Sequence, residues 1–223
     1  MNGFFLDRTE AGQRLACRMH EYQNCPHLVV LGLPRGGMPV ARAVAAALHT
    51  SMDALVVRKL GLPCAEEVAM GAIAPGGVCV LDEDLIDELD IGGDVVSSVR
   101  RVEAAELERR NLVYRDGGLP PDVAGKIVVI VDDGVATGAT CEAAIVYLKR
   151  AGAAKIIVAA PVISMEAFRR LRPIADDIVA VVVPSLLRSV GEWYTRFPQM
   201  SDADVCETLH PIEKGRERSF VPA

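Results

Sequence analysis

The stretch from Val128 to Thr140, which reads VVIVDDGVATGAT, constrains the fold of this chain more than any other. It begins with a β-branched apolar run that fits a strand buried on both faces. Two adjacent carboxylates follow, and a turn of small residues then leads into a segment whose apolar residues have helical spacing. We therefore expect a buried strand, a tight loop and a helix, with Asp132 and Asp133 where the strand ends.

The loop after these carboxylates suits a phosphate group. Small residues let backbone N–H groups close around an anion at a helix N-terminus, where the helix dipole favours negative charge. Thr137 and Thr140 can add hydroxyl donors. Because Asp132 and Asp133 would repel a phosphate that faced them directly, a neutral diol, a divalent cation or both must stand between. A ribose 5-phosphate with magnesium meets this requirement.

Two other phosphate motifs do not fit this stretch. A Walker A loop ends in Gly-Lys-Ser/Thr, whereas Gly138 is followed by Ala139. A dinucleotide fingerprint needs three spaced glycines directly after the strand and has no carboxylate pair. The remaining alternative is an ordinary strand, turn and helix with surface aspartates, although two acids at the end of a buried strand are costly without a use.

The stretch VVIVDDGVATGAT resembles the signature of the type I phosphoribosyltransferases. These enzymes bind 5-phosphoribosyl-1-pyrophosphate (PRPP) and move its ribose 5-phosphate between pyrophosphate and a nitrogen nucleophile. The resemblance implies that Asp132 and Asp133 are catalytic residues that contact the ribose 2- and 3-hydroxyls, directly or through Mg²⁺. It assigns binding of the 5-phosphate to the loop and the start of the helix, namely Gly134, Val135, Ala136, Thr137, Gly138, Ala139 and Thr140.

A second anion-binding turn follows the first expected strand. Pro34-Arg35-Gly36-Gly37 leads into a helix, and its glycines let the backbone approach an anion while Arg35 offers a fork of donors. The turn resembles the family's pyrophosphate loop, which makes Arg35, Gly36 and Gly37 candidate PRPP-binding residues. Taken alone, it could equally be a helix-entry turn with an unrelated arginine.

Arg58 and Lys59 lie at the end of the next expected strand. The following segment, with Gly61 and Pro63, predicts a mobile loop. It resembles the flexible loop of orotate and adenine phosphoribosyltransferases, in which an Arg-Lys pair serves the pyrophosphate, so Arg58 and Lys59 become candidate catalytic residues. The alternative is a solvated strand end. Glutamates 66 and 67 in this segment are candidates for a general base.

Ala136 narrows the chemistry that the resemblance implies. Hypoxanthine-guanine enzymes carry an aspartate at this point of the signature, which is commonly assigned to proton transfer at the purine. A small residue here is similar to the adenine and uracil members. We therefore expect that a 6-oxopurine is not the substrate.

Hydrophobic periodicity predicts alternating strands and helices. Strands are expected at His27-Leu33, Ala54-Arg58, Lys126-Asp132, Lys155-Val162 and Asp177-Val183, and helices at Met38-Leu48, Ala139-Ala151 and Ser164-Leu171. This alternation predicts an α/β fold, a mostly parallel sheet flanked by helices, in a single domain over residues 1–223. The core is placed at about residues 27–183, with a small hood from residues 1–26 and 184–215.

An insertion separates the second and third expected strands. It should hold a hairpin, Val68-Ala74 with Val78-Leu81, and a long helix from about Asp94 to Arg115. The helix has an apolar stripe and a charged side that we expect in solvent. The stripe is Val95, Val99, Val102, Leu107 and Leu112, and the charged side is Glu103, Glu106, Glu108, Arg109 and Arg110.

The hood should hold the acceptor. Its C-terminal part carries Trp193, Tyr194 and Phe197 in a chain with only 4% aromatic residues. These rings could stack on a heterocycle, or they could form a hydrophobic cluster that anchors the C-terminal helix. The second interpretation is favoured.

Composition is consistent with a compact cytoplasmic enzyme. The net charge of -6 disfavours binding to nucleic acid or membranes. No apolar run reaches membrane-spanning length, and we expect no signal peptide. The six cysteines lack a CxxC pair and predict reduced thiols; they are Cys17, Cys25, Cys64, Cys79, Cys141 and Cys206.

Two functions therefore compete. The first is a phosphoribosyltransferase that uses PRPP and Mg²⁺ to transfer ribose 5-phosphate to a nitrogenous base or amine with release of pyrophosphate, or runs in reverse from a nucleotide. The second is a non-catalytic PRPP- or nucleotide-binding regulatory protein on the same fold. Arg35, Arg58 and Lys59 favour the enzyme, because a sensor needs less pyrophosphate chemistry. Type I relatives are often homodimers, but no stretch here specifies an interface.

Overall fold

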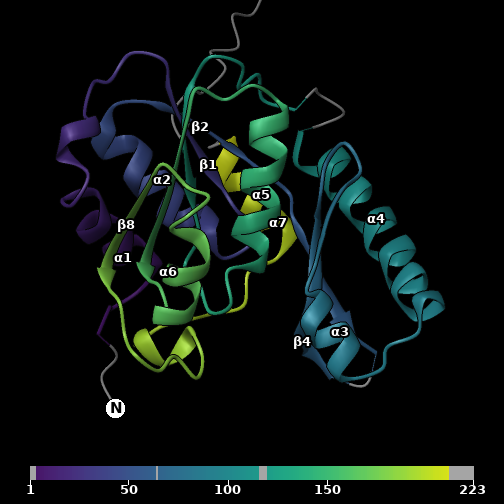
Figure 1. The fold of residues 1–223 in the computed structure, drawn as a ribbon. Helices are drawn as coiled ribbons and strands as arrows, with labels where there is room; N and C mark the ends of the chain where they lie inside the picture. Colours follow the sequence, from purple (N-terminus) through teal and green to yellow (C-terminus); the bar gives the residue numbers. More distant parts are fainter. Residues whose placement is uncertain (1–3, 64, 116–119, 211–223) are drawn as a thin grey trace, which may run out of the picture.

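The protein contains two sheets that lie side by side (Figure 1). The computed structural model describes residues 4–63, 65–115 and 120–210, apart from the side chains of residues 66 and 67. A five-stranded sheet in the order β2-β1-β6-β7-β8 is parallel throughout, and a three-stranded sheet in the order β3-β4-β5 is antiparallel. The predicted α/β fold, with a mostly parallel sheet flanked by helices, is confirmed.

The large sheet holds most of the expected elements. Its strands are β1 (Leu28–Gly32), β2 (Ser51–Ala54), β6 (Ile127–Val131), β7 (Lys155–Val162) and β8 (Asp177–Val182). The helices around it are α1 (Arg8–Ala16), α2 (Gly37–Leu48), α5 (Ala139–Arg150) and α6 (Met165–Leu171), and α7 (Asp202–Leu209) follows near the end of the chain. Two short 3-10 turns, His20–Tyr22 and Gly191–Trp193, complete this part.

Each face of the parallel sheet has its own hydrophobic core, because side chains alternate along a strand. Leu31 and Ile130 pack in a cluster with residues of α5 and α6. Their neighbours Val30 and Val129 point the other way and pack with residues of α1 and α2. Burial on both faces explains the continuous β-branched runs and fixes the carboxyl ends of β1 and β6 side by side.

The predicted strand Ala54-Arg58 is wrong. β2 ends at Ala54, residues 55–57 form no strand, and Arg58 begins the second sheet. Leu55 N still donates to Gly32 O at 2.9 Å, and the chain then passes between the two sheets. Leu55, Val56 and Val57 are buried there, so their apolar character reflects a buried connection rather than a strand.

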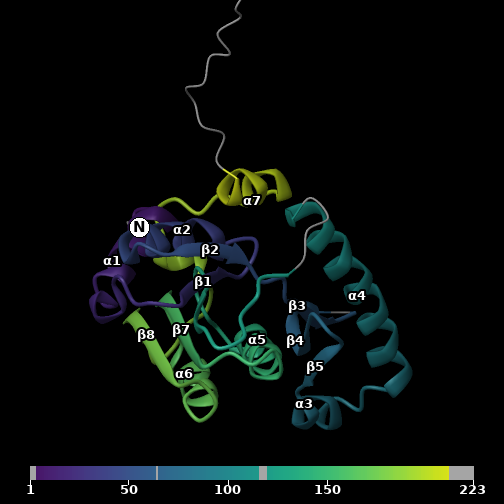
Figure 2. The ribbon, with the colours of Figure 1, turned by 90° about the horizontal axis from the view of Figure 1, so that it is seen from above.

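The insertion forms a compact unit beside the large sheet. It comprises β3 (Arg58–Leu62), β4 (Ala65–Ala74), β5 (Val78–Leu81), α3 (Glu83–Glu88) and α4 (Gly93–Arg115). The predicted hairpin is present as β4 and β5, and the segment expected to be a mobile loop lies in a second hairpin, β3 with β4. α4 runs along this unit and meets α7 near its C-terminal end (Figure 2).

The prediction for the two sides of α4 is wrong in part. Val102 and Leu112 are 65% and 62% exposed, whereas Leu107 and Tyr114 are buried. Glu103 and Arg110, which were expected in solvent, instead line a cavity. Periodicity misses this arrangement because the surface that faces this side of the helix is itself polar and charged.

The hood joins the two ends of the described chain. Phe5 N donates to Trp193 O and Thr195 N donates to Phe5 O, both at 2.8 Å. The Tyr194 ring centroid lies 5.4 Å from that of Phe5 and 4.9 Å from that of Phe197. The aromatic residues do form a hydrophobic cluster. It was expected to anchor the C-terminal helix, but it instead joins the segment around Tyr194 to the N-terminal segment around Phe5.

Candidate active site

The backbone of the loop after β6 is hydrogen-bonded to the end of β7 and to the segment between β7 and α6. Val135 N donates to Val162 O at 2.9 Å, and Ser164 N donates back to Val135 O at 2.9 Å. The Ser164 hydroxyl donates to Ala136 O at 2.5 Å. These three bonds fix the backbone on the inner side of the loop and leave its other side toward a cavity.

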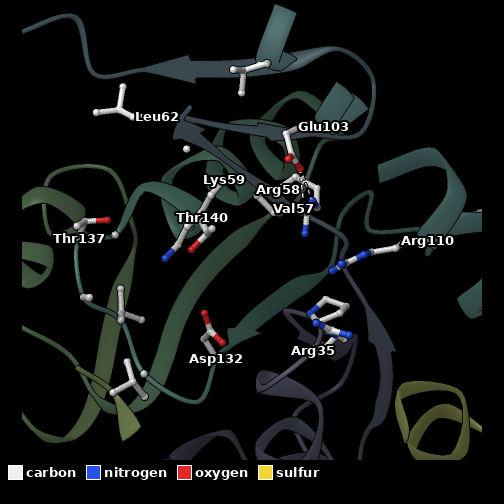
Figure 3. A pocket seen from close by; sticks show the side chains of 18 of the residues that line it. Arg35, Val57, Arg58, Lys59, Leu62, Glu103, Arg110, Asp132, Thr137 and Thr140 are labelled. Carbon is white, nitrogen blue, oxygen red and sulfur yellow. Dashed lines mark hydrogen bonds and ion pairs between the residues drawn. The ribbon is translucent and has the colours of Figure 1, made fainter. Parts of the chain in front are cut away.

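The start of α5 keeps its backbone donors available for a ligand. The N-cap residue is Gly138, with φ +83° and no side-chain capping bond. In this left-handed conformation a residue with a Cβ would be strained. The uncapped N–H groups and the helix dipole favour an anion. Thr137 and Thr140, which precede and follow Gly138 in the sequence, line the same cavity (Figure 3).

Asp132 and Asp133 form a partly buried, mutually repelling pair. Asp133 N donates to Asp132 Oδ1 at 2.9 Å. Burial raises the pKa of Asp132 well above its usual range, and the negative charge of Asp133 raises it further. Burial also raises the pKa of Asp133, against the opposing effect of a nearby arginine. A ligand or cation that offsets this negative charge would relieve the repulsion.

That arginine is Arg8, whose role the sequence did not indicate. Arg8 Nε donates to Asp133 Oδ2 at 2.8 Å, with side chains only 9% and 13% exposed. Its Nη1 donates to Pro198 O at 2.8 Å, and its guanidinium lies 3.8 Å from the Phe197 ring centroid. The Tyr194 hydroxyl donates to Asp133 O at 2.5 Å. The hood therefore holds Asp133 directly.

The turn after β1 lies against the same carboxylates. A Cβ added at Gly36 would overlap the Asp133 carboxylate, and one at Gly37 would lie 2.6 Å from Val131 O. The peptide bond between Pro34 and Arg35 is cis. The two glycines thus permit close packing on the end of β6, while Arg35 lines the cavity.

Arg58 and Lys59 enter the cavity from β3. Arg58 donates to Glu103 Oε2 through Nε at 2.6 Å, and its Nη2 lies 2.5 Å from the same oxygen. Lys59 is close enough for its positive charge to favour the ionised form of Asp132 and so oppose the rise in that pKa. Arg58 is therefore already paired with Glu103 through Nε and Nη2.

One cavity of about 750 Å³ brings most of the predicted residues together at the carboxyl ends of β1 and β6 (Figure 3). Gly36 lines a smaller neighbouring cavity, and Gly37 and Ala139 line neither of the two. The predicted residues that line the large cavity are Arg35, Arg58, Lys59, Asp132, Asp133, Gly134, Val135, Ala136, Thr137, Gly138 and Thr140.

α4 contributes a wall of this cavity that the sequence analysis missed. Val99, Val102, Glu103 and Arg110 line it together with Ser98. The charged run of the helix was the available signal, but a run of this kind is typical of a solvated face. The proposed general bases, glutamates 66 and 67, have side chains outside the described residues.

The described part of the chain holds no ready-made metal centre. Within it, no three His, Cys, Asp or Glu side chains form a cluster that could hold a metal ion. An ion at this site would therefore rely on the aspartate pair and on the ligand. None of the described helices is both long and apolar enough to cross a membrane.

An open parallel sheet with a cation-lined cavity beyond its carboxyl ends is characteristic of α/β proteins that bind nucleotides or sugar phosphates. The chain belongs to the phosphoribosyl transferase domain family, whose model matches residues 7–198.

Relatives agree with this assignment. The chain is 42% identical over 205 residues to "Putative phosphoribosyl transferase Rv0571c" from Mycobacterium tuberculosis, an alignment that covers 92% of this chain and 46% of that protein. This chain therefore spans about half the length of that relative.

Among solved structures, TT1426 from Thermus thermophilus matches with TM-score 0.76 and 37% identity, covering 94% of this chain and 98% of that one. AQ2163 from Aquifex aeolicus matches with TM-score 0.50 and 12% identity, covering 91% and 85%, and supports the fold alone.

Proposed function

We propose that the protein is a magnesium-dependent phosphoribosyltransferase that binds PRPP in the large cavity. The observation that carries the proposal is the convergence of three features on one cavity: the partly buried aspartate pair, the uncapped start of α5, and cations from the Arg35 turn and from β3. Each feature matches one part of PRPP, namely its diol, its 5-phosphate and its pyrophosphate.

The proposed roles follow from position. Asp132 and Asp133 accept hydrogen bonds from the ribose 2- and 3-hydroxyls, and the loop from Gly134 to Thr140 holds the 5-phosphate. Arg35, Arg58 and Lys59 face the pyrophosphate, which gains negative charge as it leaves. Fixed cations that meet this developing charge lower the barrier, because they are oriented before the reaction begins.

The aspartate pair fits magnesium. Mg²⁺ prefers hard oxygen ligands and is usually held by one or two carboxylates together with substrate phosphates. Its charge would offset the repulsion that raises the pKa of Asp132. When bound, the ion would supply positive charge to the diphosphate and the ribose hydroxyls. The protein's own contribution is to fix the two carboxylates, through Arg8 and the Asp133 backbone N–H.

The acceptor is proposed to be a nitrogenous base or amine. A centre with oxocarbenium character at the anomeric carbon would react with water, so the site must exclude water while the acceptor attacks. Val57, which is buried, and Val99 give the cavity an apolar part that would serve this purpose. Ala136 still predicts that a 6-oxopurine is not the substrate.

A screen for PRPP-dependent release of pyrophosphate, with nucleobases and small amines as acceptors, tests this proposal. The reverse screen supplies nucleotides with pyrophosphate and detects PRPP. We expect one acceptor to give release that Asp132→Asn abolishes. A protein that binds PRPP but turns over no candidate would favour the regulatory alternative. A protein that binds neither PRPP nor a nucleotide would refute both.

A further inference from the structure

Arg110 lies outside the PRPP signature, on α4, yet its side chain reaches the large cavity. It is only 12% exposed. Figure 3 shows its guanidinium pointing toward Arg35, so two guanidinium groups converge from different elements. Leu107 and Tyr114 belong to the same hydrophobic cluster as Met38 in the first turn of α2, which holds α4 next to the Arg35 turn.

The charges around the cavity leave its Arg35 end positive. Among the described residues, four cations and three carboxylates line it, but two of these carboxylates are already paired, Asp133 with Arg8 and Glu103 with Arg58. Within the same part of the chain, Arg35 and Lys59 form no ion pair. Cations that converge on one cavity repel one another, and only some of these have a carboxylate partner, so this arrangement suits an anionic ligand.

Arg110 is held in position while part of it stays available. Its Nε donates to Glu106 Oε1 at 2.7 Å, and its two terminal nitrogens donate no hydrogen bond to another described residue. Glu106 is fixed in turn by Arg109, which donates to it at 2.7 and 3.0 Å and to Asp202 of α7 at 2.6 Å. Hydrogen bonds from Arg109 and Arg110 lower the pKa of Glu106 to about 2, so it remains a charged anchor.

Arg109, the neighbouring residue on α4, forms an ordinary ion pair on the helix surface and can be compared with Arg110. It also pairs with Glu106, but its side chain is 48% exposed and it does not line the cavity. Surface pairs of this type contribute little to stability. Arg110 differs from it in burial and in direction, and both differences point to a ligand.

We propose that Arg110 is a binding residue for the pyrophosphate group and that α4 therefore forms part of the active site. The inference rests on the proposed function. Arg110 and Arg35 would grip phosphate oxygens from two sides, because a guanidinium presents paired donors in a fixed plane. Docking of α4 on α7 then supports pyrophosphate binding through Asp202, Arg109 and Glu106.

Titration calorimetry with three ligands tests this assignment. The ligands are PRPP with Mg²⁺, pyrophosphate with Mg²⁺, and ribose 5-phosphate, which lacks the pyrophosphate group. Arg110→Ala should weaken binding of the first two by about ten- to a hundredfold, the range of a charged hydrogen bond. Ribose 5-phosphate should bind as it does to the wild type. Arg110→Lys should restore part of the loss, because it keeps the charge without the fork.

Arg101→Ala is the matched control, since it removes the same charge from an exposed position of α4. It should leave all three affinities unchanged. Unchanged pyrophosphate affinity in Arg110→Ala would overturn the inference and leave the proposed function intact. An equal loss for all three ligands would overturn it as well, by showing a structural role. A wild-type protein that binds neither PRPP nor pyrophosphate would instead refute the proposed function itself.

Discussion

Two single substitutions, one in the aspartate pair and one at its partner Arg8, should change the stability of the protein in opposite directions. Asp132→Asn removes one of two repelling, partly buried charges, and the amide can still accept the hydrogen bond from Asp133 N. It should stabilise the ligand-free protein. Arg8→Met keeps an apolar side chain near Phe197 but removes the cation that pairs with Asp133. It should destabilise the protein, because two carboxylates are then left without this counter-charge.

The expected magnitudes follow from burial. Breaking a buried ion pair by removing one partner costs about 3–5 kcal/mol, and the 13% exposure of Asp133 places Arg8→Met at the lower end, about 3 kcal/mol. Relief of a buried repulsion by Asp132→Asn should add about 1–2 kcal/mol, as in other functional sites that sacrifice stability. For a chain of this size the melting temperature should fall by roughly 6–12 °C in Arg8→Met and rise by roughly 2–8 °C in Asp132→Asn.

The effect of Asp132→Asn should depend on pH. Because burial raises the pKa of Asp132 above its unfolded value, the folded state binds the proton more tightly. The free energy of unfolding of the wild type therefore falls as pH rises from the unfolded pKa, about 4, through the folded one. Below about pH 4 the carboxyl is neutral in both states, so the advantage of the variant should vanish there and grow as pH rises.

Urea denaturation of wild type and both variants, followed from pH 4 to pH 8, measures these differences. The double variant should lose less stability than Arg8→Met alone, because Asp133 then has one fewer repelling neighbour. If Asp132→Asn destabilises the protein at neutral pH, or if its effect is independent of pH, repulsion between the two carboxylates does not control the stability of the site.

Three further substitutions test other parts of the site. Ser164→Ala removes the clamp on the phosphate loop and the N-cap of α6, so stability should fall by about 1–2 kcal/mol and ribose 5-phosphate should bind more weakly in calorimetry. Glu103→Gln frees Arg58 from its charged partner and should tighten PRPP binding severalfold; weaker binding would mean that Glu103 orients Arg58 for the ligand. Gly36→Ala should cost about 1–3 kcal/mol in denaturation and abolish PRPP binding, because its Cβ overlaps Asp133; a stable variant that binds would contradict the geometry.

The parts of the site that the sequence predicted are local. Strand, aspartate pair, loop and helix are consecutive from Val128 to Thr140, so turn chemistry and burial determine their structure without knowledge of the rest of the fold. The position of Arg35 next to them followed from one topological rule, that ligands bind beyond the carboxyl ends of parallel strands. The parallel pairing of β1 with β6 places the carboxyl ends of these two strands next to each other.

The missed parts depend on contacts between distant segments. Arg8 and Asp133 are 125 residues apart in sequence, and nothing near Arg8 marks it as the partner of a carboxylate. Glu103 and Arg110 belong to a charged run that looks like a solvated helix face, and only the packing of α4 beside β3 and α7 turns one side of it toward the cavity. Apolar residues 55–57 were misassigned for a similar reason, because burial in a connection and burial in a strand give the same pattern.

The most direct test of the central claim is thermal unfolding of the wild type and Asp132→Asn with and without PRPP and Mg²⁺. Ligand at a hundred times its dissociation constant should add about 2.7 kcal/mol to the stability of the wild type. Asp132→Asn should start from a higher melting temperature and show no shift, so that its loss of binding is not a loss of folding. No shift of the wild type at saturating PRPP and Mg²⁺, or an undiminished shift in Asp132→Asn, would contradict the assignment of this cavity as a PRPP site.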